Sequence, residues 1–480
     1  MTTSVTRRND LFIGGVWTPG HRDRIEVINP SDGTVITTVA DASPEDGTAA
    51  VDAATAALPQ WAATSPRQRA EILRRAYELM TEHAEQLAYL ISLENGKSLA
   101  DARGEVSYAA EFFRWYSEEA VRLLGEISLA PSGANRIMVQ HQPIGVCLLV
   151  TPWNFPAAMA TRKLAPALAA GCTAVLKPAT TTPLTAYAVA DLMTQAGVPD
   201  GVVNVVTTSD NAEVTATMMR HPKVRKLSFT GSTEVGRLLL REASQRVLKC
   251  AMELGGNAPF IVLPDADVDK ALDGVMVAKM RNGGQACTAA NRIYVHRSLH
   301  DVFASRLAQR FAGLQVGPGT DESTQCGPLV DERSVAKVRE LVTDAQHLGA
   351  EVLTGGAAPE RPGYYFPPTV LANVRPDSRL ASEEIFGPVA ALIPFDDVED
   401  VISAANDTEY GLSAYVYSGD LAKGLQVAER LESGMVAVNR GLVSDPAAPF
   451  GGVKQSGLGR EGGHHGMLEF TETKYIAVDW

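Results

Sequence analysis

Short apolar segments that do not alternate with polar residues recur along this chain, and helical segments separate them. Residues 146–150 read Val-Cys-Leu-Leu-Val, and strands are also expected at residues 202–206 and 224–229. A strand that is buried on both faces carries a continuous apolar run, whereas a strand with one solvated face alternates. Strands that alternate with helices build parallel sheets covered on both faces. The sequence therefore predicts an α/β fold with a doubly wound parallel sheet.

Long amphipathic patterns precede these strands. Between residues 65 and 93, apolar side chains return at three- and four-residue steps, which predicts helical structure throughout the stretch. Another helix is expected from residue 102 to residue 124. Its aromatic cluster is interpreted as core packing: Phe112, Phe113, Trp115 and Tyr116.

The chain has 480 residues, which is enough for two or three domains. The strand–helix alternation continues after residue 290 and predicts a second α/β domain. Because no linker separates the halves, we place their boundary in a tight cleft near residues 254–257. The predicted domains are residues 1–134 with 147–254, residues 255–445, and a small β unit of residues 135–146 with 466–480.

The charge balance and the cysteines limit the partners and the compartment. A formal net charge of −13 argues against nucleic acid or an anionic membrane surface as partner. Five widely spaced cysteines without a C-x-x-C pair suit a reducing cytoplasm, and neither a disulfide framework nor a zinc site. Residues 1–10 lack the apolar region of a secretory signal, and the most apolar stretch, residues 164–176, is too short to span a bilayer.

A cysteine at position 287 follows two glycines and a glutamine within residues 282–288. Glycines let the backbone approach a neighbouring group closely or adopt a positive φ. In such a turn the thiol is accessible, and its own peptide N–H can face the oxyanion that the thiol creates. A small, inert, buried cysteine is the alternative, and this segment alone does not separate the two.

Two further polar residues lie at strand ends, where α/β proteins bind ligands. Glu253 precedes a second Gly-Gly pair and is a candidate base that activates water against an intermediate on Cys287. A surface carboxylate is the alternative. Asn154 follows residues 146–150, and its amide is a candidate donor to the oxyanion, although an asparagine between prolines and aromatics is usually a turn residue.

A turn from Gly231 to Gly236 opens a predicted helix directly after a strand. A glycine there permits close approach of a cofactor, and the helix N-terminus favours a phosphate. The G-x-G-x-x-G fingerprint is absent, so this turn alone is a weak signal for a dinucleotide.

Residues 282–288 and 252–257 together resemble the active-site segments of the aldehyde dehydrogenase superfamily, and the resemblance covers nearly the whole chain. It implies that Cys287 is the nucleophile, Glu253 the general base and Asn154 the oxyanion donor. It also implies a variant Rossmann cofactor domain, a catalytic domain, and an arm that pairs with a neighbouring subunit in a homodimer or homotetramer.

The resemblance also implies a cofactor site. Where the family carries an acid for the adenosine ribose of NAD, just after the Lys-Pro-Ala segment, this chain has Thr180. Thr180 leaves room for a 2′-phosphate with Lys177 near as a cation, so we expect a preference for NADP, with NAD as the alternative. Glu384 is expected to hold the nicotinamide-side ribose, with Phe386 beside it. The other implied cofactor-binding residues are Thr151, Pro152, Trp153, Ala179, Gly231, Ser232 and Leu254.

Arg162, Arg281 and Ser444 match residues that bind the distal carboxylate in the succinate-semialdehyde dehydrogenase branch. Two arginines converging on one cleft suit a carboxylate through paired N–H donors, although an arginine taken singly is more often part of a structural ion pair. The resemblance therefore implies a small anionic aldehyde, succinate semialdehyde, as substrate. Glutarate semialdehyde or another short aldehyde is an alternative. A thiol esterase without redox chemistry, or a catalytically silent homologue, would be a different class of protein.

Four further positions carry no catalytic or binding assignment. Some branch members carry a second cysteine where this chain has Ala289, so a disulfide switch is not expected there. His464 and His465 have no partner at metal-ligand spacing, so no metal site is expected. Arg440 carries no interpretation from the sequence.

Overall fold

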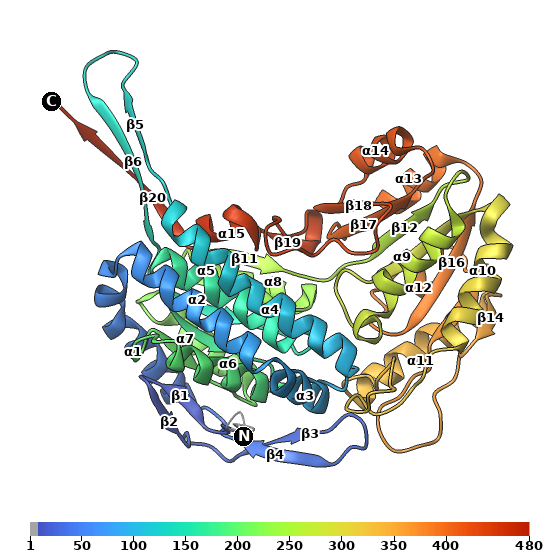
Figure 1. Cartoon of the computed structure of the whole chain (residues 1–480), viewed down its shortest axis with the longest axis horizontal. Coiled ribbons are helices and arrows are strands. Elements are labelled where there is room, and N and C mark those ends of the chain that lie inside the picture. Colours follow the sequence, from blue (N-terminus) through green and yellow to red (C-terminus); the bar gives the residue numbers. More distant parts are fainter. Residues whose placement is uncertain (1–7, 480) are drawn as a thin grey trace.

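The computed structural model describes residues 8–479, which form two α/β domains and a projecting β arm (Figure 1). Residues 1–7 and residue 480, assigned above to the cofactor domain and the arm, lie outside the described residues, as does most of the segment considered for a secretory signal. The predicted α/β fold class is confirmed. In this described part of the chain, no helix combines the length and apolarity needed to cross a membrane.

The first sheet carries the predicted parallel strands. Within residues 8–479 its order is β19-β11-β10-β7-β8-β9-β1-β2. The five strands from β11 to β9 run parallel, and the outer strands pair antiparallel. The bounds are β1 (Leu11–Ile13), β2 (Val16–Thr18), β7 (Val146–Val150), β8 (Thr173–Lys177), β9 (Val203–Val205), β10 (Val224–Thr230), β11 (Lys249–Glu253) and β19 (Gly457–Leu458).

Helices cover both faces of this sheet, which explains the apolar run in β7. Cys147 and Leu149 of β7 pack into the core beneath helices α2 to α6, while Leu148 packs beneath α1, α7 and α8 on the other face. These helices are α1 (Pro44–Ala63), α2 (Pro66–Glu82), α3 (Ala84–Asn95), α4 (Leu99–Glu119), α5 (Pro156–Ala170), α6 (Pro183–Gln195), α7 (Asn211–Arg220) and α8 (Thr233–Ser244).

The stretch of residues 65–93 forms two helices. Ser65 begins α2 with a capping box in which its side chain and that of Gln68 bond each other's backbone N–H groups. His83, with φ −101° and ψ 18°, leaves the helical region between α2 and α3. The apolar period continues across His83 because both helices pack on the same core. Periodicity alone therefore did not reveal the interruption.

The second sheet has seven strands in the described residues, in the order β14-β15-β16-β13-β12-β17-β18. Only β14 pairs antiparallel. Helices α9 and α10 pack on one face and α11 to α14 on the other. The strands are β12 (Ala258–Val262), β13 (Ala290–His296), β14 (Glu351–Thr354), β15 (Thr369–Ala372), β16 (Val389–Phe395), β17 (Ser413–Tyr417) and β18 (Met435–Val438). The helices are α9 (Val268–Met280), α10 (Arg297–Ala312), α11 (Glu332–His347), α12 (Arg379–Ser382), α13 (Val398–Asn406) and α14 (Leu421–Arg430).

The arm is a three-stranded antiparallel sheet of β5 (Glu126–Leu129), β6 (Arg136–Pro143) and β20 (Thr471–Val478), and it projects from the body (Figure 1). Strand β5 lies before the predicted boundary at residue 135. The predicted unit of residues 135–146 contains β6, whereas β5 is four residues long and exposed throughout, which leaves no inward face to mark it in the sequence.

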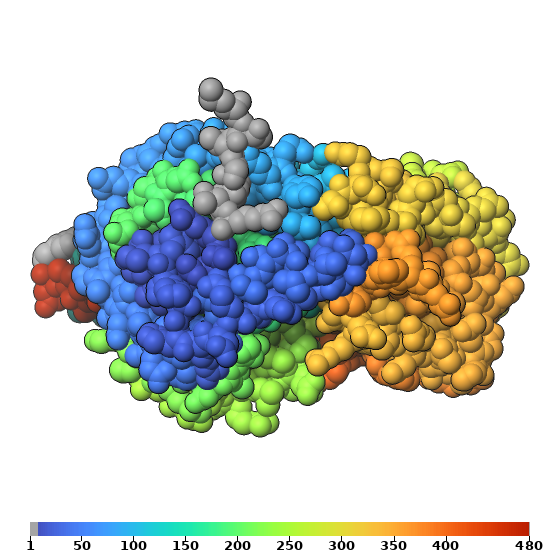
Figure 2. All heavy atoms as spheres, turned by 90° about the horizontal axis from the view of Figure 1, so that it is seen from below, coloured from blue at the N-terminus to red at the C-terminus, as the bar shows by residue number. Residues whose placement is uncertain are grey.

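The N-terminal hairpin of β3 (Ile25–Ile28) and β4 (Val35–Val39) reaches from the first domain to the second, which Figure 2 shows as a blue segment against an orange one. The backbone N–H of Tyr364 donates to the carbonyl of Pro30 at 3.0 Å there. Strand β11 ends at Glu253 and β12 begins at Ala258, so the carboxyl edge of the first sheet faces the amino edge of the second. The residues singled out in the sequence lie at this junction.

Candidate active site

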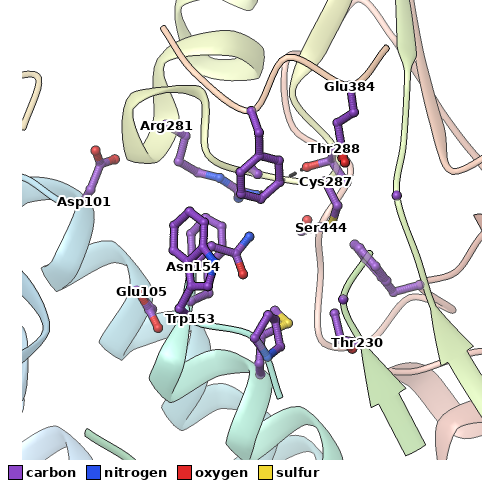
Figure 3. A pocket seen from close by; sticks show the side chains of 18 of the residues that line it. Asp101, Glu105, Trp153, Asn154, Thr230, Arg281, Cys287, Thr288, Glu384 and Ser444 are labelled. Carbon is purple, nitrogen blue, oxygen red and sulfur yellow. Dashed lines mark hydrogen bonds between the residues drawn. The ribbon is translucent and has the colours of Figure 1, made fainter. Parts of the chain in front are cut away.

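A cavity of about 470 Å³ lies where the two sheets meet. Loops after β7 and β10, the turn η2 (Arg281–Gly284) and the segment that follows it, and residues near positions 384 and 444 form its walls (Figure 3). The predicted site residues that line it are Pro152, Trp153, Asn154, Arg162, Gly231, Ser232, Leu254, Arg281, Cys287, Glu384, Phe386 and Ser444.

Both Gly-Gly pairs are required by close backbone contacts around Cys287. A Cβ on Gly256 would lie 2.3 Å from the carbonyl oxygen of Cys287, and one on Gly284 would lie 2.1 Å from that of Gly387. Gly283 and Gly284 also adopt positive φ angles of 58° and 77°. Larger residues would therefore push the cysteine loop out of its position.

The amide of Asn154 lies against the cysteine loop. Asn154 is buried, and its Nδ2 donates to the carbonyl of Gln285 at 3.1 Å. Figure 3 shows Asn154 and Cys287 on different segments, and both line the cavity. The arrangement brings together a thiol and a side-chain N–H donor that an oxyanion formed at the thiol requires.

The cavity raises the pKa of the Cys287 thiol. Burial raises it to about 12, Arg162 and Arg281 act in the opposite direction, and Glu384 and Glu253 add to the rise. The protonated thiol is thus the resting form at neutral pH. A thiolate must be generated for attack, because the thiolate is the nucleophile.

We expect the rate at which iodoacetamide alkylates Cys287 to rise about tenfold per pH unit between about pH 7 and pH 9.5, because the thiolate stays the minor species throughout. The measurement is mass spectrometry of the modified peptide, with no other ligand added. The Cys287→Ala protein reports the labelling of the other cysteines. A plateau below about pH 9 would place the pKa far lower and contradict this expectation.

Glu253, the last residue of β11, is buried behind the cavity and is not among the described residues that line it. A Cβ on Gly451 would lie 3.0 Å from its Oε1, so the carboxylate faces that glycine. Burial raises the pKa of Glu253 well above its usual value, and Glu461 adds to the effect, while Arg162 and Lys163 oppose it. The carboxylate must turn toward Cys287 to act on a group bound there.

Arg162 is paired with a carboxylate that the sequence analysis did not assign. Its Nε lies 2.6 Å from Oε2 of Glu461, and Lys163 and Ser228 contact the other oxygen of Glu461. Burial lowers the pKa of Arg162, but the nearby Glu461 carboxylate, together with other neighbouring groups, keeps the pKa above its usual value. The guanidinium also lies 4.2 Å from the ring centre of Phe450. A ligand at Arg162 would share it with Glu461.

Arg281 lines the cavity without such a partner. Its guanidinium lies 5.0 Å from the ring centre of Phe155, and its Nη2 donates to Oγ1 of Thr288 at 3.5 Å. Among residues 8–479 no carboxylate forms an ion pair with it, and Ser444 adds a hydroxyl to the same cavity. This combination suits an anionic group, which Arg281 would bind with its remaining N–H donors.

The Glu384 side of the cavity is polar and half-buried. Oε1 of Glu384 accepts a hydrogen bond from the N–H of Gly256 at 3.1 Å, and burial raises its pKa to about 7 against the opposing effects of Lys337 and Lys279. Phe386 packs edge-on to Trp153 with ring centres 5.4 Å apart. Together these side chains form a wall with one acidic group and two aromatic faces.

Besides Glu253, four predicted cofactor-binding residues lie outside the cavity lining: Thr151, Lys177, Ala179 and Thr180. They lie at the carboxyl ends of β7 and β8, which are adjacent in the sheet, and the N–H of Thr151 donates to the carbonyl of Lys177 at 3.1 Å. The Lys177 ammonium bonds Oδ1 of Asn211, and burial lowers its pKa to about 8. The expected cation is therefore present, with Asn211 as its partner.

Sequence reasoning missed several residues of this region. Glu461 carries no interpretation from the sequence, and Thr230, the last residue of β10, is expected there only as the start of the turn that opens the next helix. Thr230 Oγ1 lines the cavity and is buried without a hydrogen-bond partner among the described residues. A polar residue at the carboxyl end of a parallel strand was the available signal for Thr230. Thr288 and Phe450 lacked any local signal.

Known proteins share this fold and sequence. The chain matches the aldehyde dehydrogenase family over residues 17–476. It is 53% identical to a succinate-semialdehyde dehydrogenase of Paenarthrobacter nicotinovorans, over 92% of this chain and 99% of the relative. Identity is 49% to the NADP(+) succinate-semialdehyde dehydrogenase GabD of Escherichia coli K12, over 98% of each chain.

A second kind of relative and a solved structure are also similar to this chain. A glutarate-semialdehyde dehydrogenase of Pseudomonas putida is 49% identical over 98% of each chain. A crystal structure described as an E. coli NADP dependent enzyme has a TM-score of 0.98 and 48% identity, with all of both chains covered. The fold of this chain thus occurs in a protein of similar sequence over its whole length.

Proposed function

The chain belongs to the aldehyde dehydrogenase family, and from this premise we propose that it oxidises succinate semialdehyde to succinate with NADP+ as hydride acceptor. The substrate assignment rests on Arg281. Its guanidinium lines the cavity of Cys287 and forms no ion pair with a carboxylate among residues 8–479. Related proteins named for succinate semialdehyde support the same assignment.

The cavity wall fits a dinucleotide. A Cβ on Gly255 would lie 3.2 Å from Oε2 of Glu384, so the glycine keeps this carboxylate oxygen accessible, and Oγ1 of Thr230 offers a second unpartnered group. Glu384 would hold the ribose beside the nicotinamide, between the aromatic wall and Leu254. When bound, NADP+ accepts the hydride that leaves the aldehyde carbon.

The proposed preference for NADP+ rests on Thr180 and Lys177. A carboxylate at position 180 would repel a 2′-phosphate, whereas threonine leaves room for it. The Lys177 ammonium lies at the same sheet edge and remains mostly protonated at pH 7, since its pKa is about 8. NAD+ remains the alternative acceptor.

The chemistry follows from the side chains around Cys287. The thiolate adds to the aldehyde carbon, and the new oxyanion accepts hydrogen bonds from Nδ2 of Asn154 and the N–H of Cys287. Loss of one such donor typically raises the barrier by about 2.7–4 kcal/mol. After the hydride departs, a thioester remains on Cys287.

Hydrolysis of the thioester requires a base, and Glu253 supplies it. Its side chain turns from Gly451 into the cavity and takes a proton from the attacking water. Burial raises the pKa of Glu253 above its ordinary value, which makes its carboxylate a stronger base than a solvated one. Succinate then leaves, and the thiol is regenerated.

The test is the absorbance of reduced nicotinamide during steady turnover with succinate semialdehyde, measured with NADP+ and NAD+ side by side. Glutarate semialdehyde, which one relative is named for, and butanal complete the panel. We expect the highest kcat/KM with succinate semialdehyde and NADP+. Faster turnover of butanal would refute the carboxylate site, and faster turnover with NAD+ would refute the cofactor preference alone.

Arg281 provides a selective test of carboxylate recognition. Arg281→Met removes charge-assisted hydrogen bonds worth about 1.5–3 kcal/mol, so kcat/KM for succinate semialdehyde should fall about 10- to 100-fold. Butanal, which lacks the carboxylate, should lose less than threefold by the same comparison. Arg297→Met, an exposed arginine paired with Asp396, is the control. Equal losses on both aldehydes would show that Arg281 has a structural role.

We also propose a cytoplasmic homodimer or homotetramer. Strand β5 of the arm is exposed, with Ile127 65% and Leu129 54% accessible, and β18 is an edge strand beside a groove of about 480 Å³. Open strand edges and exposed apolar side chains favour pairing with another chain. The cytoplasmic assignment rests on the five widely spaced cysteines, which suit a reducing compartment. The molar mass from light scattering tests the oligomer.

A further inference from the structure

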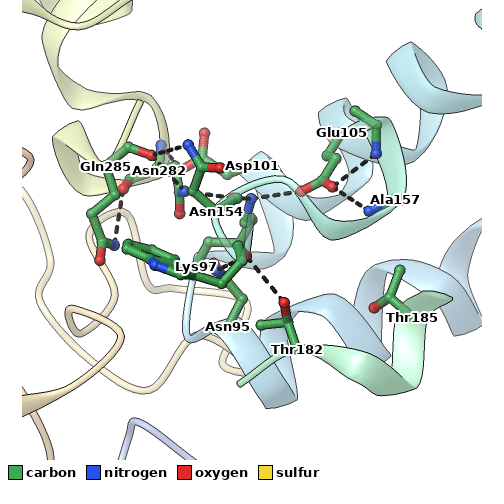
Figure 4. Close-up of polar contacts among 12 residues, drawn as sticks. Asn95, Lys97, Asp101, Glu105, Asn154, Ala157, Thr182, Thr185, Asn282 and Gln285 are labelled. Carbon is green, nitrogen blue, oxygen red and sulfur yellow. Dashed lines mark hydrogen bonds and ion pairs between the residues drawn. The ribbon is translucent and has the colours of Figure 1, made fainter. Parts of the chain in front are cut away.

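The two proposed oxyanion donors, the Asn154 amide and the Cys287 N–H, come from different domains. Their relative position therefore depends on contacts between the two loops that carry them. Asn154 lies after β7 in the first domain, and Cys287 lies between η2 and β13 in the second. A buried set of polar contacts joins these two loops to the connection between α3 and α4 (Figure 4).

Lys97 lies at the centre of these contacts. Its side chain is fully buried, and its Nζ donates to Oε2 of Glu105 and to the backbone carbonyl of Asn154, both at 2.6 Å. The ammonium also lies 4.0 Å from the ring centre of Phe155. A buried ammonium is costly unless it is paired, so its position is tightly defined by these partners.

Glu105 explains why the ammonium stays in place. Oε1 of Glu105 accepts hydrogen bonds from the N–H groups of Ala157 and Ala158 at 2.8 and 3.2 Å, in the first turn of α5. The helix N-terminus stabilises this carboxylate. Burial lowers the pKa of Lys97, and Glu105 acts in the opposite direction. Lys97 and Glu105 thus form one unit fixed to the start of α5.

Both peptide groups around the Cα of Asn154 are held. The carbonyl of Asn154 accepts from Lys97 and, at 2.8 Å, from Nδ2 of Asn282, whose own N–H donates to Asp101 at 3.0 Å. The preceding carbonyl, of Trp153, accepts from Nδ2 of Asn95 at 3.0 Å. Fixing both peptide planes fixes the direction of the Cα–Cβ bond, and thereby aims the Asn154 amide.

We propose that Lys97 is a positioning residue of the oxyanion hole, which acts on the reaction by holding the Asn154 carbonyl. This proposal rests on the proposed roles of Cys287 and Asn154. Lys97 lies outside the cavity lining, and its ammonium links the Asn154 carbonyl to the buried charge of Glu105. Without it, the Asn282 amide is the one remaining donor to the Asn154 carbonyl within residues 8–479, and the Asn154 amide is free to shift within the cavity.

The experiment is a double-mutant cycle between Lys97→Met and Asn154→Ala. A misplacement of about 1 Å can cost about 100-fold in rate, so we expect Lys97→Met to lower kcat about 100-fold while KM for NADP+ changes less than about twofold. In the Asn154→Ala background the same substitution should cost less than about threefold, because no amide remains to be aimed. Equal losses in both backgrounds, or no loss in the native background, would overturn the proposal.

A charge-balanced variant and a stability measurement separate the positioning role of Lys97 from misfolding. Lys97→Met leaves Glu105 without its counter-ion, so the cycle is repeated with Lys97→Met/Glu105→Gln, in which both buried charges are removed together. The same non-additivity is expected, and additive losses in this cycle would also refute the proposal. Thermal unfolding of each variant reports its stability.

The cycle is also measured on hydrolysis of p-nitrophenyl acetate without cofactor. This reaction needs Cys287 and the oxyanion hole, but neither a semialdehyde nor NADP+. If the native protein fails to oxidise succinate semialdehyde, the proposed substrate is wrong, and the ester cycle still decides the role of Lys97. Non-additive losses on the ester would support it, and additive losses would refute it.

Discussion

Replacing Cys287 with alanine is expected to lower the rate of aldehyde oxidation at least about 10⁴-fold, because loss of a catalytic nucleophile typically costs this much or more. The thiol lines the cavity that also holds Asn154 and Arg281, and the other cysteines lie outside that lining. Alanine fills the space of Cβ and removes only the sulfur, so the loop contacts with Gly256 and Gly387 remain. The loss should appear in kcat with little change in cofactor binding.

Cys250→Ala is the matched control, since Cys250 is also partly accessible but lies on β11 outside the cavity lining. It should retain native kcat/KM. The measurement is absorbance of reduced nicotinamide, with ligand-induced stabilisation in thermal unfolding as a check of cofactor binding. Persistent turnover by Cys287→Ala would remove the nucleophile assignment.

Glu253→Gln should separate the two halves of the reaction. The amide has the shape of the carboxylate but cannot take a proton from water. We expect a first turnover of reduced cofactor at close to the native rate, followed by steady turnover about 10²- to 10⁴-fold slower, which is the usual contribution of a general base. Burst kinetics of this kind report accumulation of the covalent intermediate.

Rapid-mixing absorbance measures both phases in one trace. Glu213→Gln, at an exposed glutamate on α7, is the control and should behave as the native protein. Loss of the burst together with steady turnover would mean that Glu253 is needed before the hydride leaves, which would contradict its assignment to hydrolysis.

The fold was predictable because its signal is local. A strand such as β7, buried on both faces, is apolar at every position, and residues 146–150 carry that pattern. The break at His83 was not predictable from periodicity, since α2 and α3 bury apolar residues in one core. Strand β5 was missed because an exposed four-residue strand has no apolar face.

The site was predictable in part. Cys287, Glu253 and Asn154 are marked by glycines or strand ends in the chain, and the structure brings all three to the junction of the sheets. The partner of Arg162 was not predictable, because Glu461 meets it only after α5 packs on the tail of the chain. Lys97 likewise contacts Asn154 57 positions away, through the packing of α4 on α5. Long-range ion pairs depend on such packing and leave no local pattern.

Oxidation of succinate semialdehyde is expected to leave a succinyl group attached to Cys287 as a thioester. The most direct measurement is mass spectrometry of the Glu253→Gln protein, quenched in acid after mixing with succinate semialdehyde and NADP+. A single succinyl group on the peptide that contains Cys287, formed together with one equivalent of NADPH, is the predicted result. NADPH formation with an unmodified Cys287, or a succinyl group on another residue, would contradict the account.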